Sequence, residues 1–161
     1  MKNLKKEYEN FGFFKKESFL DKNLIEKTIG EINALKNNVD IYYDKKGSLR
    51  RIERIYDKGE GLELVHKNVL NLLKEVFQFD FAIFKDKFNA KPPGGEGFFA
   101  HYDGIFKFKN ENNKTKNGWY EYSNLFVNVL IALDPCNNEN GTIELSNAQQ
   151  GGFDKLFLNT K

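Results

Sequence analysis

Two stretches of this chain repeat apolar residues at the spacing of an α-helix. The first runs through residues 24–35, and Asp21 precedes it as a candidate N-cap. The second covers residues 62–76 and follows Gly59 and Gly61. In both stretches the apolar positions fall on one side, which is typical of helices that pack against a core. The pattern therefore predicts two amphipathic helices in the first half of the chain.

Shorter patterns favour strands and turns. Residues 39–43 are β-prone and lead into a turn at 45–47, whereas residues 48–56 fit either a strand or a helix. Residues 79–89 are rich in aromatic side chains and are predicted to form a strand. Residues 125–133 are almost continuously apolar, which is typical of a strand buried on both faces.

The C-terminal half adds further turn and strand signals. Residues 109–118 are rich in Asn and Lys and predict a mobile hairpin or lid. Asn140 and Gly141 are the favoured pair of a type I′ turn, after which residues 142–145 would begin the return strand. Residues 153–158 are predicted to form one last strand.

These elements indicate a mainly β protein with N-terminal helices, an α+β arrangement in which helices support an antiparallel β-sandwich or jelly roll. The length of 161 residues fits a single domain, 1–161. We expect residues 1–78 to form a helical buttress and residues 79–161 to form the β region.

Composition narrows the possible partners and the compartment. The net charge is +2, and no apolar run is long enough to cross a bilayer, so we expect neither nucleic acid nor a membrane as partner. Cys136 is the only cysteine, which rules out an internal disulfide and fits a reducing compartment. The charged start lacks the apolar stretch of a signal peptide, so we expect a cytoplasmic protein.

The strongest chemical signal is the tripeptide from His101 to Asp103. In an extended backbone these two side chains leave the same face, so both would point into one space. Two such ligands and a second histidine make the facial site of non-haem Fe(II) oxygenases. Residues 91–97, rich in Pro and Gly, would form a loop at the rim of that site. The alternative is a chance triplet in which both side chains only make hydrogen bonds.

Four segments around this tripeptide follow one another in order: Lys-Phe-Asn-Ala-Lys-Pro-Pro-Gly-Gly at 87–95, His101-Tyr102-Asp103, Phe-Val-Asn-Val-Leu-Ile-Ala-Leu-Asp at 126–134 and Glu-Asn-Gly-Thr-Ile-Glu at 139–144. In order and spacing they resemble the phytanoyl-CoA dioxygenase family of Fe(II)- and 2-oxoglutarate-dependent oxygenases. The opening Tyr-Glu-Asn-Phe-Gly-Phe-Phe at 8–14 is also similar, so the resemblance covers most of the chain.

The resemblance implies a double-stranded β-helix, cupin-like fold, here a part of one. It implies Fe(II), 2-oxoglutarate and O2 as cofactor and co-substrates, and hydroxylation of a C–H bond in a small-molecule substrate. By position, His101 and Asp103 would be catalytic metal ligands, and Lys87 and Asn128 would contact 2-oxoglutarate. Related halogenases have a small residue at the position of Asp103, so a carboxylate there predicts a hydroxylase.

One departure from the family pattern concerns residues that the family places downstream. The family uses a second histidine as third ligand and an arginine for 2-oxoglutarate, yet no His or Arg follows Asp103. We therefore expect the N-terminal part of an oxygenase, inactive as it stands, that a C-terminal segment or a second chain would complete. The alternative function is a non-catalytic β-sandwich binding or scaffold protein in which His101 and Asp103 are structural.

Other polar and aromatic residues keep two interpretations each. His66 lies in the second predicted helix, where a partly buried histidine without metal is the common case. Three arginines, at 50, 51 and 54, would bind an anion or form a solvated face. Three aromatic residues, at 119, 120 and 122, would line a substrate pocket or belong to the core. Asn128 needs a partner if buried, either a co-substrate or the backbone.

Overall fold

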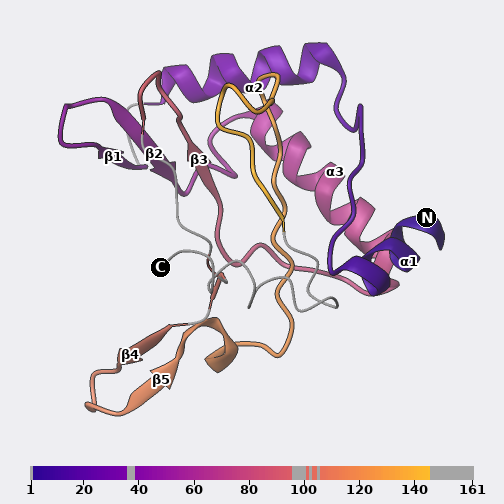
Figure 1. Cartoon of the computed structure of the whole chain (residues 1–161), viewed down its shortest axis with the longest axis vertical. Helices are drawn as coiled ribbons and strands as arrows, with labels where there is room; N and C mark the ends of the chain where they lie inside the picture. The colour runs from indigo at the N-terminus through magenta and orange to yellow at the C-terminus, as the bar shows by residue number, and fades with distance from the viewer. Residues whose placement is uncertain (1, 36–38, 96–100, 102, 105, 146–161) are drawn as a thin grey trace.

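The computed structural model describes residues 2–35, 39–95, 101, 103–104 and 106–145. The described chain combines helices with two small antiparallel sheets, so the fold is mixed α+β (Figure 1). The elements in chain order are α1 (Lys2–Phe11), α2 (Lys22–Ala34), β1 (Asp40–Tyr43), β2 (Leu49–Glu53), α3 (Glu60–Phe77), β3 (Lys87–Asn89), β4 (Lys107–Lys109), β5 (Thr115–Asn117) and the 3-10 turn η1 (Gly118–Glu121).

Both helices predicted from periodicity are present. Asp21 caps α2 as expected, because its side chain accepts the backbone N–H of Leu24 at 2.9 Å. The buried positions of α2 are Leu24, Thr28 and Ile32, at the helical spacing that the pattern predicts. Helix α3 begins at Glu60, so Gly61 lies inside the helix rather than before it.

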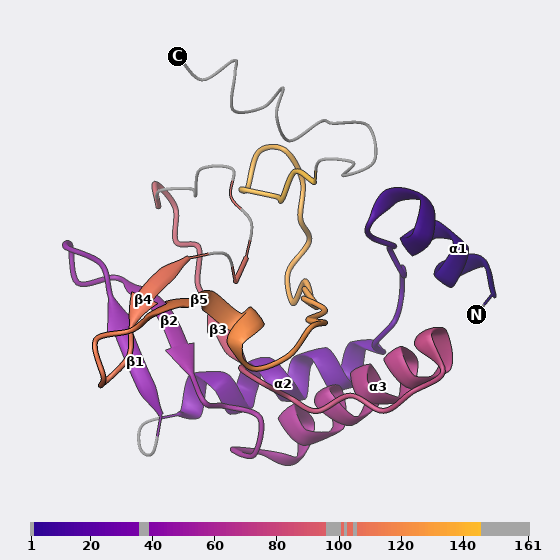
Figure 2. The same cartoon turned by 90° about the horizontal axis from the view of Figure 1, so that it is seen from below.

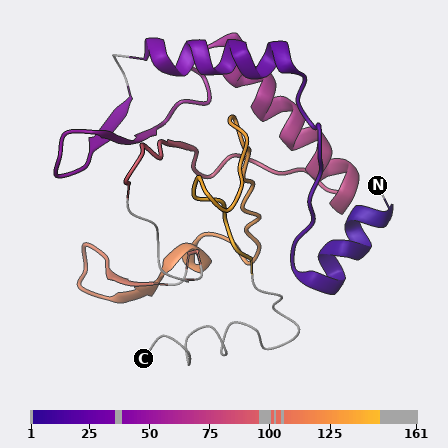
Figure 3. The ribbon, with the colours of Figure 1, turned by 45° about the horizontal axis from the view of Figure 1, so that its top comes forward.

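Helix α1 was not predicted, because its charged sequence offers only a narrow apolar stripe. None of its residues is buried, and its main anchor is Tyr8, whose ring meets Phe77 edge-on with centroids 4.9 Å apart. Phe77 is the last residue of α3, so α1 packs beside the C-terminal end of that helix (Figure 3).

The ambiguous stretch 48–56 contains a strand, β2, which forms the centre of a three-stranded antiparallel sheet. The register places Ile41 of β1, Ile52 of β2 and Phe88 of β3 side by side. This row packs on the buried cluster that contains Ile32 and Leu62. Residues 49–53 form a strand because the alternation of side chains in a strand places Ile52 on the face that packs on the core, in line with the apolar residues of the two neighbouring strands. The sheet also joins the two expected regions, since β3 lies in 79–161 and its partner in 1–78.

Helices α2 and α3 are joined by a carboxylate. Glu31 of α2 accepts the backbone N–H groups of Gly61 and Leu62, each at 2.9 Å, in the first turn of α3. Those N–H groups have no partner within the helix, and Gly59 at the N-cap has no side chain to accept them. A Cβ at Gly61 would lie 2.9 Å from Oε2 of Glu31, so glycine allows the close approach of the two helices.

The β region differs most from the expectation. Of residues 79–89 only Lys87–Asn89 forms a strand, and neither 125–133 nor 142–145 does. In this part of the chain the described residues offer those segments no neighbouring strand, and a strand needs a partner for its N–H and C=O groups. Helices therefore contribute more described residues than strands, which corrects the mainly β expectation. The described strands form two open sheets and no closed barrel, so the jelly roll stays a prediction.

The expected type I′ turn at Asn140 and Gly141 is also wrong. Such a turn needs positive φ at both residues, but only Gly141 has it, at 81°. The loop is instead closed by Asn137, whose carbonyl accepts the N–H groups of Asn140 and Thr142 at 3.3 Å. The expected strand at 153–158 lies outside the described residues. By contrast, the hairpin predicted for 109–118 is confirmed by the pairing of β4 with β5.

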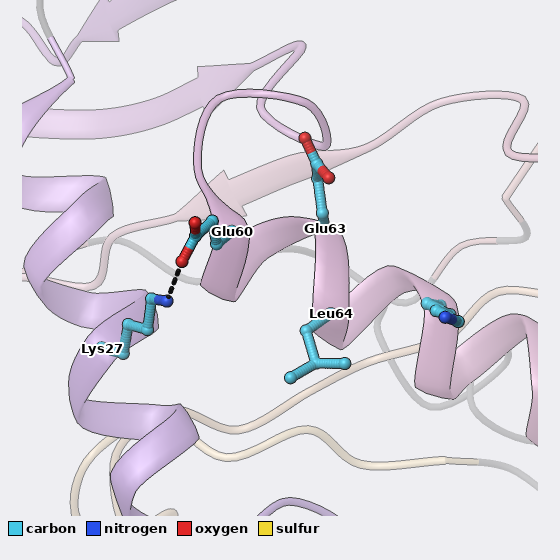
Figure 4. Close-up of a pocket in the computed structure, with 5 residues that line it drawn as sticks. Lys27, Glu60, Glu63 and Leu64 are labelled. Atoms are coloured by element: carbon cyan, nitrogen blue, oxygen red, sulfur yellow. Dashed lines mark hydrogen bonds and ion pairs between the residues drawn. The ribbon is translucent and has the colours of Figure 1, made fainter.

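Two surface features complete the fold. A depression between α2 and α3 is crossed by the ion pair of Lys27 and Glu60, whose N and O atoms are 2.7 Å apart (Figure 4). Its other lining residues include Glu63 and Leu64. Across the described parts of the chain, we find no helix with the length and apolar character that a membrane crossing requires.

We predict that Glu31→Ala lowers the free energy of unfolding by about 1–3 kcal/mol, because it leaves two helix N–H groups without an acceptor. Urea denaturation followed by circular dichroism measures this. Glu26→Ala on the same helix is the matched control, since Glu26 is exposed and makes a 3.6 Å pair with Lys22. It should cost no more than about 0.5 kcal/mol. Equal losses in the two variants would contradict the bridging role of Glu31.

Candidate functional site

The structure brings the two predicted metal ligands together. Nε2 of His101 lies 3.4 Å from Oδ1 of Asp103, and the side chains are 57% and 47% exposed. Tyr102 between them lies outside the described residues, so the extended backbone expected for the tripeptide stays a prediction. Asp103 itself lies in a turn that continues into Gly104.

Asn128, predicted as a contact of 2-oxoglutarate, lies beside one of these two predicted ligands. Its Nδ2 donates to Oδ2 of Asp103 at 2.9 Å, across 25 positions of sequence. The two carboxylate oxygens of Asp103 therefore face different partners, with Oδ1 toward His101 and Oδ2 toward Asn128. Asn128 is exposed, whereas the apolar pattern around it had suggested burial. Its amide has a hydrogen-bond partner in Asp103 all the same.

The backbone next to Asp103 is fixed by a close contact of two glycines. The carbonyl of Gly104 accepts the N–H of Trp119 at 3.1 Å, and both Gly104 and Gly118 have positive φ, at 78° and 56°. A Cβ on Gly104 would lie 2.7 Å from Cε3 of Trp119, and one on Gly118 would overlap the carbonyl oxygen of Gly104. The loop after the tripeptide therefore packs directly on η1.

An aromatic cluster holds η1 and the segment of Asn128 in place. Phe84, Trp119 and Phe126 all contact one another, with ring centroids 5.0–5.8 Å apart. Beyond Asn128 along the chain, Leu133 packs on the core cluster of Ile52 and Leu62. Segment 125–133 thus runs from the β4–β5 hairpin back toward α2 (Figures 1 and 2). Trp119 is partly buried in this aromatic cluster, whereas Tyr120 is 57% exposed.

The corner between β5 and η1 depends on one carboxylate. Glu121 accepts the ammonium of Lys116 at 2.7 Å and the backbone N–H of Asn117 at 2.8 Å. The hydrogen bond from Lys116 is the larger cause, and that from the backbone of Asn117 the smaller cause, of a pKa of Glu121 below its ordinary value of 4.5. The ionised form of Glu121 therefore stabilises the element that packs on the loop of Asp103.

The two lysines near the Pro-Gly loop have different surroundings. Lys87, the other predicted 2-oxoglutarate contact, is exposed in β3 and lies opposite Glu53 in the register. No hydrogen bond or ion pair among the described residues joins it to Asp103 or Asn128. Lys91, which the sequence did not single out, donates to the carbonyl of Gly141 at 2.7 Å and so connects the Pro-Gly loop to the turn around Gly141.

His66 lies in α3 with partners of its own. Its Nδ1 lies 2.7 Å from the carbonyl of Leu62, so that nitrogen carries the proton, and its Nε2 lies 3.9 Å from Oδ2 of Asp86. This is the partly buried helical histidine that we set against a metal role.

The arginines at 51 and 54 make ion pairs with nearby acids. Nε of Arg51 lies 3.0 Å from Glu53, and Nη2 of Arg54 lies 2.8 Å from Asp40. The guanidinium of Arg51 also lies 4.4 Å from the ring centroid of Tyr42. These contacts favour a structural role for both arginines, with Arg51 partly buried beside Glu53 and Arg54 exposed beside Asp40.

The pair of His101 and Asp103 fits part of an Fe(II) site. Two ligands about 2.1 Å from one cation and at right angles would be about 3 Å apart, close to the observed separation. An imidazole nitrogen and a carboxylate oxygen are also the donors that such a site uses. Among the described residues, however, no third His, Cys, Asp or Glu joins them in a group suited to a metal ion.

Comparison with known proteins shows similarity to a 2-aminoethylphosphonate dioxygenase from Uncultured bacterium HF130_AEPn_1, 26% identical over 100 residues. The match covers 61% of this chain and 34% of that protein, so the chain spans about a third of the relative's length. No family model and no solved structure matches the chain. The similarity supports an oxygenase function in general, whereas iron, 2-oxoglutarate and membership of the phytanoyl-CoA dioxygenase family stay predictions.

We predict that Gly104→Ala displaces Trp119, because the new methyl group meets its indole ring at positive φ. Trp119 is the only tryptophan, so its emission maximum and intensity report this contact directly. Gly47→Ala is the matched control, since Gly47 also has positive φ, at 80°, but has open space around its Cβ position. It should lose about 1 kcal/mol of stability without changing the emission. An unchanged emission in Gly104→Ala would contradict the described packing.

We also predict that acid loosens the corner of η1. A pKa lowered by folding means that the contact of Glu121 stabilises the fold above pH 4.5 and is lost as the pH falls through the folded pKa. Trp119 emission, followed from pH 7 downward, should therefore change only after the pH has fallen below the ordinary glutamate value of 4.5. Glu121→Gln should show the loosened emission already at pH 7, whereas Glu111→Gln in the exposed hairpin turn should follow the wild type. Identical titrations for all three proteins would rule out this role.

Proposed function

We propose that this chain forms part of an Fe(II)- and 2-oxoglutarate-dependent dioxygenase that hydroxylates a C–H bond of a small molecule. The observation that supports it most is the approach of His101 and Asp103, whose donor atoms lie 3.4 Å apart. A chance triplet need not direct an imidazole and a carboxylate at one another. The similarity to a dioxygenase over 61% of the chain supports the same proposal independently.

In this proposal His101 and Asp103 would hold the metal. When bound, Fe(II) supplies the redox chemistry by which O2 and 2-oxoglutarate convert R–H into R–OH, with succinate and CO2 as the other products. The carboxylate of Asp103 would occupy the position on the cation that a chloride needs in the related halogenases, which favours hydroxylation over halogenation as the outcome. Lys87 is proposed as a cationic partner for a carboxylate of 2-oxoglutarate.

We place the third ligand on further polypeptide, either a downstream segment or a second chain. This chain has no His after Asp103, and His66 is engaged with Leu62 and Asp86. Large apolar side chains stand exposed on residues 125–145, which pair with no strand among the described residues, with Leu130 and Leu145 exposed by 67% and 63%. Such an apolar segment without a ladder partner is suited to pairing with additional strands. Those strands would also bring the arginine for 2-oxoglutarate.

The proposed substrate is a small organic molecule. The name of the similar dioxygenase gives 2-aminoethylphosphonate as what that protein acts on. That compound is a small, charged molecule, which supports a small molecule rather than a macromolecule as substrate here. The cytoplasm, where 2-oxoglutarate is available, stays the proposed location.

A second candidate function rests on the same contact. The distance from Nε2 of His101 to Oδ1 of Asp103 also suits an ion pair with a protonated imidazole. In that case the pair stabilises the loop, and the chain is a binding or scaffold protein without redox chemistry.

We predict that anaerobic addition of Fe(II) and 2-oxoglutarate gives the visible charge-transfer band of the chelate, and that His101→Ala abolishes it. His66→Ala should retain the band, because His66 lies in α3 with other partners. A band that survives His101→Ala would place the metal elsewhere. Absence of a band in the unaltered chain would favour the structural function, and adding the downstream polypeptide of a longer form would decide between an incomplete and a metal-free site.

A further inference from the structure

We infer that Asn128 is a positioning residue for the metal ligand Asp103, a role that rests on the proposed function. Its Nδ2 lies 2.9 Å from Oδ2 of Asp103, so its partner is the carboxylate itself. An ionised carboxylate only accepts hydrogen bonds, and the amide NH2 of Asn is a donor, which fixes the orientation of the amide. The resemblance had suggested a different partner, 2-oxoglutarate.

The hydrogen bond selects which oxygen of Asp103 remains for the metal. With Oδ2 engaged by the amide, Oδ1 is the oxygen that faces Nε2 of His101. Without the amide, rotation about the last side-chain bond of Asp103 exchanges the two oxygens freely, because the carboxylate is 47% exposed. Asn128 therefore restricts the Asp103 carboxylate before a cation binds, so less side-chain conformational entropy is lost on binding. Such partners of metal ligands typically contribute a factor of about 10–100 in metal affinity.

The position of Asn128 is itself fixed from both sides along the chain. Phe126 packs against Phe84 and Trp119, and Leu133 packs on the core beneath the three-stranded sheet. The backbone of Gly104, next to Asp103, is held on η1 by Trp119. Ligand and amide are thus carried by two segments that share one aromatic cluster, which allows the hydrogen bond to orient the carboxylate.

A titration with Mn(II), a paramagnetic substitute for Fe(II) without its oxygen sensitivity, tests this inference. NMR line broadening of the His101 imidazole reports the metal at this site even when affinity is low. The titration is made without 2-oxoglutarate, and then repeated with it. Asn128→Ala removes the donor, and Asn128→Asp keeps the shape but places an acceptor against the carboxylate. Asn124→Ala, an exposed asparagine before the same segment, is the matched control.

We expect Asn128→Ala to weaken Mn(II) binding about 10–100-fold without 2-oxoglutarate, with a larger loss for Asn128→Asp and none for Asn124→Ala. Trp119 emission and the free energy of unfolding show whether the variants keep the fold. A Mn(II) affinity that is unchanged in Asn128→Ala overturns the inference. If in that variant only the dependence on 2-oxoglutarate changes, Asn128 contacts the co-substrate instead. Absence of broadening at His101 in the unaltered chain overturns the proposed metal site, and the inference with it.

Discussion

The arrangement of this protein depends on one carboxylate placed between two helices. Glu31 accepts the N–H groups of Gly61 and Leu62 and so fixes where α3 starts relative to α2. Because α2 and α3 carry Ile32 and Leu62 on their facing sides, this bridge aligns the apolar surface on which the sheet packs. A negative charge is also favourable at that end of a helix, since the helix dipole is positive there. The position of the segment that carries Asn128 also depends on this alignment, because Leu133 of that segment packs on the same core.

The part of the fold that is stabilised by near neighbours in sequence could be predicted. The periodicity of residues 24–35 and the N-cap at Asp21 identify α2, because both signals act within a few turns of one helix. The late segment 125–133 was misjudged for the opposite reason. Its apolar run indicates burial, but whether it pairs as a strand depends on neighbours that the sequence pattern does not specify. The structure leaves this segment partly buried at four positions, Phe126, Val127, Ile131 and Leu133, and exposed at the others, so apolar character alone did not define a strand.

The candidate site divides in the same way. His101 and Asp103 were found from sequence because their proximity follows from a spacing of two residues. The hydrogen bond from Asn128 to Asp103 could not be predicted, since 25 residues and two loops separate the partners. The contact of Gly104 with Gly118 was equally hidden. Glycine at each position is necessary for it, but a glycine in a polar stretch also fits an ordinary turn.

The pair of His101 and Asp103 and the apolar residues that follow Asn128 are both exposed to water, and both lack a covering element among the described residues. A carboxylate and an imidazole that are about half exposed are solvated by water, which competes with their orientation and with metal binding. Val129 and Leu130, directly after Asn128, are exposed by 47% and 67%. A strand placed on those side chains would bury apolar area and would exclude water from the neighbouring pair of His101 and Asp103. The proposed further polypeptide would then act twice, as the source of the third ligand and as the cover that makes the first two effective.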